Sequence, residues 1–98
     1  MIINSRTGFV ESGTVKTIFT GKGLVLGIMA SHNQATVETF ALYDSYIVDA
    51  AYLLLRVSVA VENTPVKFAF ANSEKIYFEN GLTVDAGDCD VFVIVETL

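Results

Sequence analysis

The sequence predicts an all-β fold, an antiparallel β-sandwich of the jelly-roll kind with about seven or eight strands. Apolar residues recur with a period of two from Thr14 onward. Turn-forming residues interrupt this alternation about every eight to twelve residues, a spacing typical of sandwiches and barrels. Helical periodicity is nearly absent. We therefore expect one domain over residues 1–98, with residues 1–11 as an N-terminal arm.

The first predicted strands lie on either side of a glycine-rich turn. Residues 14–20 are rich in β-branched side chains, which suit a pleated surface. Gly21-Lys22-Gly23 then predicts a tight hairpin, because glycine adopts positive φ without strain. Residues 24–31 are apolar on both faces except for Gly27, so we expect this strand in the interior of a sheet. Residues 32–34 form a predicted turn.

The middle of the chain alternates well over residues 35–43 and again over 53–61. Residues 44–51 lie between these strands and are predicted to form a loop that can hold one helical turn. Pro65 ends the second strand, because proline cannot donate a hydrogen bond to a sheet.

The last third of the chain predicts a short strand at 66–70 and two more at 76–78 and 82–84. Asn80-Gly81 lies between the latter two and is a hairpin signal. Residues 91–95 are apolar without exception, which predicts a central strand.

Composition indicates a protein that associates. Hydrophobic residues make up 52% of the chain, whereas charged residues make up only 17%, below the ~25% of an average soluble domain. No run reaches the ~18 apolar residues of a membrane-spanning helix, and the N-terminus lacks the layout of a signal peptide. We therefore expect a soluble homo-oligomer with no membrane partner, its excess apolar surface covered at subunit interfaces.

Charge and cysteine content exclude other classes. The net charge is −5 and the six basic residues are scattered, which argues against nucleic acid as a partner, since phosphate binding needs clustered cations. The single cysteine, Cys89, cannot form an internal disulfide or supply a cysteine-rich zinc site.

The chain offers little for catalysis. His32 and Cys89 could in principle form a base and nucleophile, but such a pair needs a third orienting group and an oxyanion hole. The segment Thr20-Gly21-Lys22-Gly23 lacks the spacing of a phosphate-binding loop. We expect no enzymatic activity and no cofactor.

Acidic residues gather near the C-terminus. Asp85, Asp88 and Asp90 are spaced so that they could reach one hard cation such as calcium. The simpler interpretation is a turn made by Asp and Gly between two strands, and we expect no metal site there. Asp44 and Asp49 receive the same interpretation.

The loop after residue 43 carries the candidate interface. Tyr46 and Tyr52 flank it, and exposed tyrosines are common anchors of protein interfaces. We take Tyr46, Ile47, Val48 and Tyr52 as candidate interface residues.

The order of motifs along the chain carries a family resemblance. The motifs are Ser12-Gly13-Thr14, TGKGLVLGI (20–28), FALYDS (40–45), LLLRV (53–57), YFENGL (77–82) and DVFVIV (90–95). In this order they resemble small virion proteins of tailed bacteriophages. The 44–52 segment departs from the family pattern by being longer, with Tyr46 and Tyr52 where small residues are expected.

The resemblance implies a capsid decoration or cement protein. Its partner would be the major capsid protein, its oligomer a homo-oligomer such as a trimer, and its place the virion surface after assembly in the host cytoplasm. Two alternatives remain open: a tail or head-to-tail joining component, and a carbohydrate-binding β-sandwich module.

Overall fold

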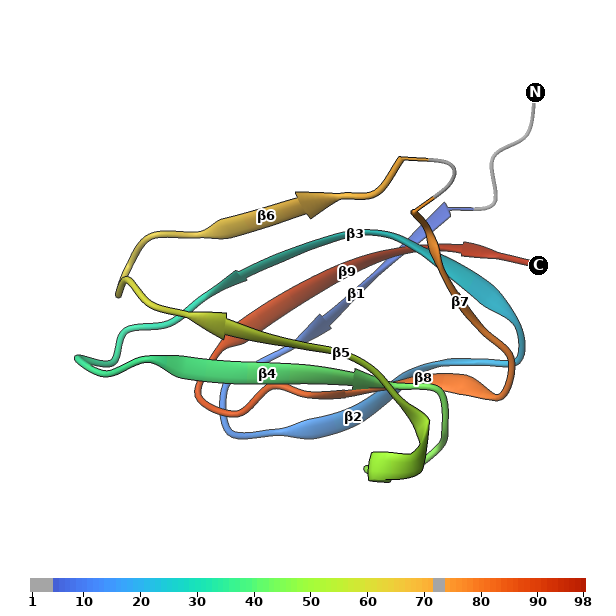
Figure 1. Cartoon of the computed structure of the whole chain (residues 1–98), viewed down its shortest axis with the longest axis horizontal. Helices are drawn as coiled ribbons and strands as arrows, with labels where there is room; N and C mark the ends of the chain where they lie inside the picture. The colour runs from blue at the N-terminus through green and yellow to red at the C-terminus, as the bar shows by residue number, and fades with distance from the viewer. Residues whose placement is uncertain (1–4, 72–73) are drawn as a thin grey trace.

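The computed structural model describes residues 5–71 and 74–98, which form two antiparallel β-sheets packed face to face (Figure 1). The five-stranded sheet has the order β1-β9-β3-β6, and β7 also pairs with β3. The four-stranded sheet has the order β2-β8-β4-β5. The strands are β1 Ser5–Val10, β2 Val15–Thr20, β3 Gly23–Ser31, β4 Glu38–Tyr43, β5 Leu53–Val59, β6 Val66–Ala69, β7 Ile76–Phe78, β8 Gly81–Asp85 and β9 Asp90–Thr97.

This order is that of a jelly roll, in which the chain passes repeatedly between the sheets. β1 and β3 lie in the five-stranded sheet, whereas β2 and β4 lie in the other. Among the described strands, β4 and β5 are the one consecutive pair joined by hydrogen bonds. The predicted antiparallel sandwich is confirmed. β1 arises from the segment for which the sequence predicts an arm.

Both predicted glycine hairpins are wrong. Gly21 has the expected positive φ of 80°, but the strands on either side of it lie in different sheets. Asn80-Gly81 likewise joins β7 to β8 across the sandwich. A type I′ hairpin needs positive φ at both central residues, and here Gly81 has a φ of 137° while Asn80 is not among the described residues with positive φ. Each turn carries the chain from one sheet to the other.

The loop between β4 and β5 contains the predicted helical turn. It is the 3-10 helix η1, Ala50–Tyr52, and the Asp49 carboxylate accepts a hydrogen bond from the Ala51 amide at 3.0 Å. β4 begins at Glu38 and β5 ends at Val59, so both strands are shorter than the alternation predicts. No helix long and apolar enough to cross a membrane occurs in residues 5–71 and 74–98.

One edge of the five-stranded sheet is divided. β3 pairs with β7 over Gly23–Val25 and with β6 over Gly27–Ala30. Leu26 is an extra residue relative to β9, a β-bulge at which the register of β3 shifts. Its carbonyl accepts a hydrogen bond from the amide of Phe70 at 2.9 Å, just beyond β6. The bulge marks the point where one edge partner gives way to the other.

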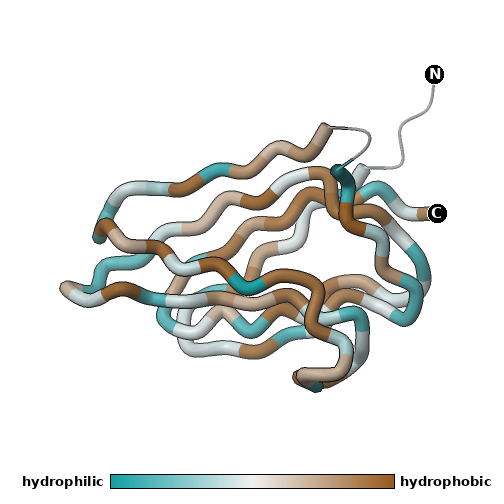
Figure 2. The backbone as a smooth tube through the Cα atoms, in the orientation of Figure 1, coloured by the Kyte–Doolittle hydropathy of each residue, from teal (hydrophilic) through white to brown (hydrophobic). Residues whose placement is uncertain are grey.

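The core lies between the sheets and follows the period of two visible as alternating colours along several strands (Figure 2). Phe40, Leu42, Leu82, Val84 and Phe78 are among the side chains with no more than 1% of their surface exposed. β9 adds its three inward valines, Val91, Val93 and Val95. A Cβ at Gly23 would lie 2.4 Å from Cζ of Phe78, so glycine lets this ring pack directly on the backbone of β3.

Replacing a core side chain tests this packing. We expect Leu42→Ala to lower the free energy of unfolding by about 2–5 kcal/mol, because burial is lost and a cavity remains. Val37→Ala, a few residues away at a position that is 59% exposed, should change it by less than about 0.5 kcal/mol. Urea denaturation followed by circular dichroism measures both, and equal effects would contradict the assignment of the core.

Candidate interaction surfaces

The outer face of the five-stranded sheet is apolar and uncovered. Along β9, Val91, Val93 and Val95 point into the core, and Phe92 and Ile94 alternate with them on the opposite side. Phe92 is 39% exposed and Ile94 44% exposed, and Met29 on β3 is 37% exposed. β9 is an interior strand, as its apolar sequence predicts. Within the described chain, however, no third layer covers its outer face.

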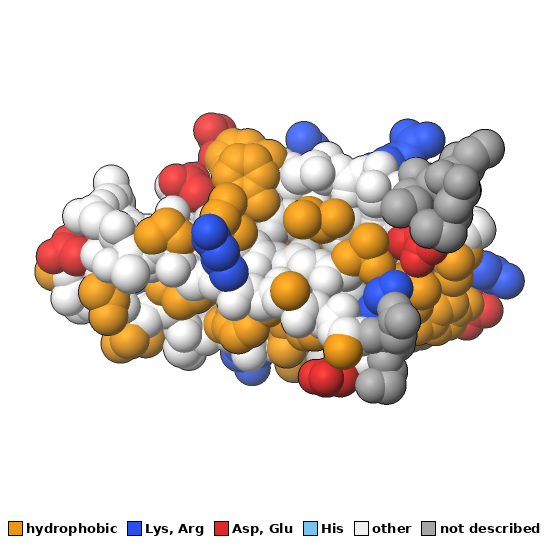
Figure 3. All heavy atoms as spheres, turned by 90° about the horizontal axis from the view of Figure 1, so that it is seen from above, with side chains coloured by type: hydrophobic (Ala, Val, Ile, Leu, Met, Phe, Trp, Pro, Cys, Tyr) orange, Lys and Arg blue, Asp and Glu red, His pale blue; other side chains and the backbone are white. Residues whose placement is uncertain are grey.

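The register of the strands aligns these side chains in rows across the sheet. One row runs through Phe9, Phe92, Met29 and Lys67, and the next through Thr7, Ile94, Gly27 and Ala69. The rings of Phe9 and Phe92 form a tilted pair with their centroids 4.6 Å apart. Lys67 is the sole charged member of the two rows. Figure 3, viewed from the side of β6 and β3, shows hydrophobic side chains across this surface.

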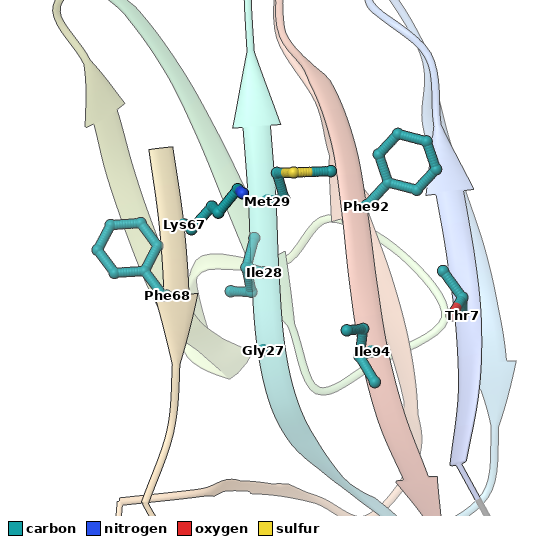
Figure 4. A pocket seen from close by; sticks show the side chains of 8 residues that line it. All are labelled: Thr7, Gly27, Ile28, Met29, Lys67, Phe68, Phe92 and Ile94. Carbon is teal, nitrogen blue, oxygen red and sulfur yellow. The ribbon is translucent and has the colours of Figure 1, made fainter. Parts of the chain in front are cut away.

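A hollow of about 300 Å³ lies in this face, with Gly27, Met29, Phe92, Ile94 and Lys67 among its lining residues (Figure 4). A Cβ on Gly27 would lie 2.9 Å from the carbonyl oxygen of Phe68. Glycine therefore permits the close approach of β6 and places no side chain at the centre of the hollow. Lys67 extends from β6 toward β3 in this view. We refer to Phe9, Met29, Phe92 and Ile94, together with this hollow, as the apolar face.

A second exposed apolar surface is the loop between β4 and β5, residues 44–52, which we call the Tyr46 loop. The sequence singles out four of its residues as a candidate interface, and the structure exposes all of them. Their exposed fractions are 60% for Tyr46, 65% for Ile47, 43% for Val48 and 49% for Tyr52. Their participation in an interface stays a prediction.

Hydroxyl groups from the four-stranded sheet hold this loop in place. The Thr83 hydroxyl donates to the carbonyl of the buried Ser45 at 2.6 Å. The Thr17 hydroxyl donates to the carbonyl of Tyr46 at 3.1 Å, and the two threonine oxygens lie 2.7 Å apart. The Ser45 hydroxyl also donates to the Ile47 carbonyl. The exposed apolar residues are therefore carried on a fixed backbone.

The two carboxylates of the loop also position the backbone. Oδ1 of Asp44 accepts hydrogen bonds from the amides of Glu79 and Asn80, at 2.9 and 2.8 Å. The Asp44 amide donates to the Tyr52 carbonyl at 2.9 Å, which closes the base of the loop. Asp49 caps η1. These roles agree with the turn-forming interpretation of both residues, and both line a shallow hollow of about 470 Å³ beside the loop.

His32 is a structural residue in this fold. It is 4% exposed, although the sequence predicts a polar turn at this position. Nδ1 accepts a hydrogen bond from the Gln34 amide at 3.1 Å, so Nε2 carries the proton and donates to the Val59 carbonyl at 2.8 Å. Because both ring nitrogens are occupied by backbone groups, neither can take a proton from a thiol. The bond to Val59 joins the end of β3 to the end of β5.

Cys89 is fully buried. Burial, followed by the negative charges of Glu38, Asp88 and Asp90, raises the pKa of its thiol. A raised pKa keeps the thiol protonated and weakens it as a nucleophile. The base and nucleophile pair considered from the sequence is not assembled.

In the acidic turn before β9, carboxylates accept hydrogen bonds from backbone amides. Oδ1 of Asp85 accepts from the Gly87 amide at 3.1 Å, and Oδ1 of Asp90 accepts from the Ser12 amide at 2.9 Å. In the part of the chain that the structure describes, no three histidine, cysteine or acidic side chains are grouped so that they could hold a metal ion. The residues act as the turn that the sequence favours.

Comparison with known proteins finds a structural likeness but no related sequence. No family model and no curated protein matches this chain. A solved structure that is similar comes from the disulfide-linked pili of Bacillus endospore appendages. It is 12% identical with a TM-score of 0.46, and the match covers 100% of this chain and 92% of the pilus chain.

The resemblance to tailed-phage virion proteins is wrong. No phage family model and no curated phage protein matches the chain, and the similar solved structure described above belongs to a bacterial spore appendage. The two functions inferred from that resemblance, capsid decoration and the tail or head-to-tail joining role, are therefore wrong as well. The major capsid protein as partner and the virion as location are corrected in the same way. The carbohydrate-binding alternative finds no support in these comparisons either.

The support of the Tyr46 loop can be tested at Thr83. We expect Thr83→Val, which keeps the shape but removes the hydroxyl, to lower the free energy of unfolding by about 1–3 kcal/mol, because the Ser45 carbonyl loses its buried donor. Chymotrypsin should then cut faster at Tyr46. Thr20→Val, at an exposed position of β2, is the matched control. Unchanged cleavage in Thr83→Val would show that the hydroxyl does not hold the loop.

Because of Cys89, we expect the free energy of unfolding to depend on pH in the alkaline range. Because the pKa of the thiol is raised in the folded chain, the unfolded chain loses this proton first as the pH rises. The contribution to stability is complete below the ordinary thiol range and declines above it. The difference in free energy of unfolding between the wild type and Cys89→Ala should therefore fall as the pH passes through that range. A difference that stays constant would show that the pKa of the Cys89 thiol is not raised in the folded chain.

Proposed function

We propose that this chain is a structural subunit that associates with copies of itself through its apolar face, and that it is not an enzyme. The observation that carries the proposal is the exposure of Phe9, Met29, Phe92 and Ile94 on one side of a sheet whose other side forms the core. Strands that are apolar on both faces usually have both faces covered. A second copy supplies the cover that the chain itself lacks.

The free energy gained by burial is largest when the four residues of the apolar face are covered together. Full burial of a Phe, Met or Ile side chain contributes about 1.5–3 kcal/mol relative to full exposure. Each of the four is between 37% and 44% exposed, so a contact gains only a fraction of that value at each position. A stable contact must therefore cover the whole apolar face. Contiguous exposed apolar patches on soluble proteins commonly mark such contacts.

The arrangement of the titratable residues supports a role without catalysis. Both nitrogens of the single histidine, His32, bond to the backbone. The single thiol, Cys89, is buried with a raised pKa. Self-association is also in keeping with the pili described for the similar structure, although the proposal stands on the apolar face.

Sedimentation velocity over a wide range of protein concentration tests self-association. We expect the wild type to pass from monomer to larger species as its concentration rises. Phe92→Asp should weaken this association about tenfold or more, because it places a charge at the centre of the contact. Val37→Asp places the same charge at an apolar residue outside the apolar face, one that is 59% exposed, and should leave association unchanged.

A wild-type chain that stays monomeric at every concentration would overturn the proposed function. Equal effects of the two substitutions would also overturn it, because they would show that association does not depend on the apolar face. Circular dichroism of each variant verifies that the fold is retained.

A further inference from the structure

We propose that the contact is heterologous: the Tyr46 loop of one copy docks onto the apolar face of the next. This inference rests on the proposed self-association and states which two surfaces meet. The apolar face is hollowed, with about 300 Å³ of space above Gly27. Two such hollows facing each other would leave a void, and voids forfeit dispersion contacts. A hollow of this kind fits a protruding apolar partner.

The Tyr46 loop has the required shape and rigidity. It carries Tyr46 and Ile47, which are 60% and 65% exposed and among the most exposed apolar residues of the described chain, and Val48, which is 43% exposed. Thr17 and Thr83 fix its backbone through the carbonyls of Tyr46 and Ser45. A loop that is already ordered loses little conformational entropy on binding. It is therefore suited to insert into a neighbour.

The two surfaces are also complementary in charge. Lys67 is the one charged residue in the two central rows of the apolar face, and in the described chain it has no ion-pair partner. The Tyr46 loop carries Asp44 and Asp49 beside its apolar residues. Asp49 uses Oδ1 to cap η1, while its second oxygen bonds to no group of the described chain. Docking places this carboxylate near the ammonium group of Lys67.

The position of the two surfaces determines what such a contact builds. η1 lies at the bottom of the view in Figure 1, whereas β3 and β6 lie at the top. A chain therefore cannot fill its own hollow with its own loop. A contact between two different surfaces forms a ring if the rotation between copies closes, and an open filament if it does not.

Mixing two variants, each defective in a different surface, provides the main test. Ile47→Asp disables the loop and leaves the apolar face intact, whereas Phe92→Asp disables the apolar face and leaves the loop intact. Each variant alone should remain monomeric at concentrations where the wild type associates. An equimolar mixture should form a 1:1 dimer and nothing larger, because one competent loop meets one competent face. Sedimentation velocity and native mass spectrometry measure the species.

The alternatives give different results. If Ile47→Asp alone associates like the wild type, the apolar faces pair with each other, so the heterologous contact is refuted while the proposed self-association survives. If both variants are monomeric and their mixture is too, a competent loop does not bind a competent face, which also refutes the inference. A monomeric wild type refutes the proposed function itself.

Charge reversal tests the pairing of Lys67 with Asp49. Lys67→Glu should weaken association several-fold, since it places two carboxylates together. Adding Asp49→Lys in the same chain should restore it by recreating the pair with its sign reversed. Adding Asp49→Ala instead, which loses the same cap of η1 and removes the repulsion without supplying a cation, should restore association only in part. Equal association in the two double variants would contradict the pairing.

Discussion

The pairing of β9 with both β1 and β3 is the interaction on which the rest of the structure depends. β9 pairs with β1 over six residues and with β3 over eight, so it joins the two terminal strands to β3 in one sheet. Its three buried valines form part of the floor of the core against the four-stranded sheet. Without β9, β1 would lose its partner in the sheet and β3 would keep only β6 and β7. The same strand carries Phe92 and Ile94 outward, so one element supports both the core and the apolar face.

Most of the strands could be predicted from the sequence, because alternation and turn residues act over a few neighbours. β1 could not, since Ser5-Arg6-Thr7-Gly8 shows no apolar alternation and becomes a strand only by pairing with β9 some ninety positions later. The direction of the glycine turns was also beyond local reasoning. Gly21 reverses the chain in either arrangement, and only the packing of two sheets decides that it crosses between them.

The two interaction surfaces differ in how far the sequence revealed them. The Tyr46 loop could be predicted because two tyrosines flank a segment between two strands, and such a segment lies on the surface in most folds. The apolar face was missed although its signal was present, in the uninterrupted apolar run of β9. That run indicated an interior strand, and the usual inference is that both faces of such a strand are covered. In this chain the cover on the outer side of β9 has to come from another molecule.

The divided edge of the five-stranded sheet limits the kind of assembly open to this chain. A long apolar edge strand is a template for uncontrolled main-chain pairing, the route to amyloid. Here the edge beside β3 is split into segments of four and three residues, β6 and β7, with a bulge at Leu26 where they change over. Neither segment is long enough to seed a continuous cross-β ladder. Growth along this edge is therefore suppressed, and a chain rich in β-forming residues remains free to recognise its neighbours through side chains.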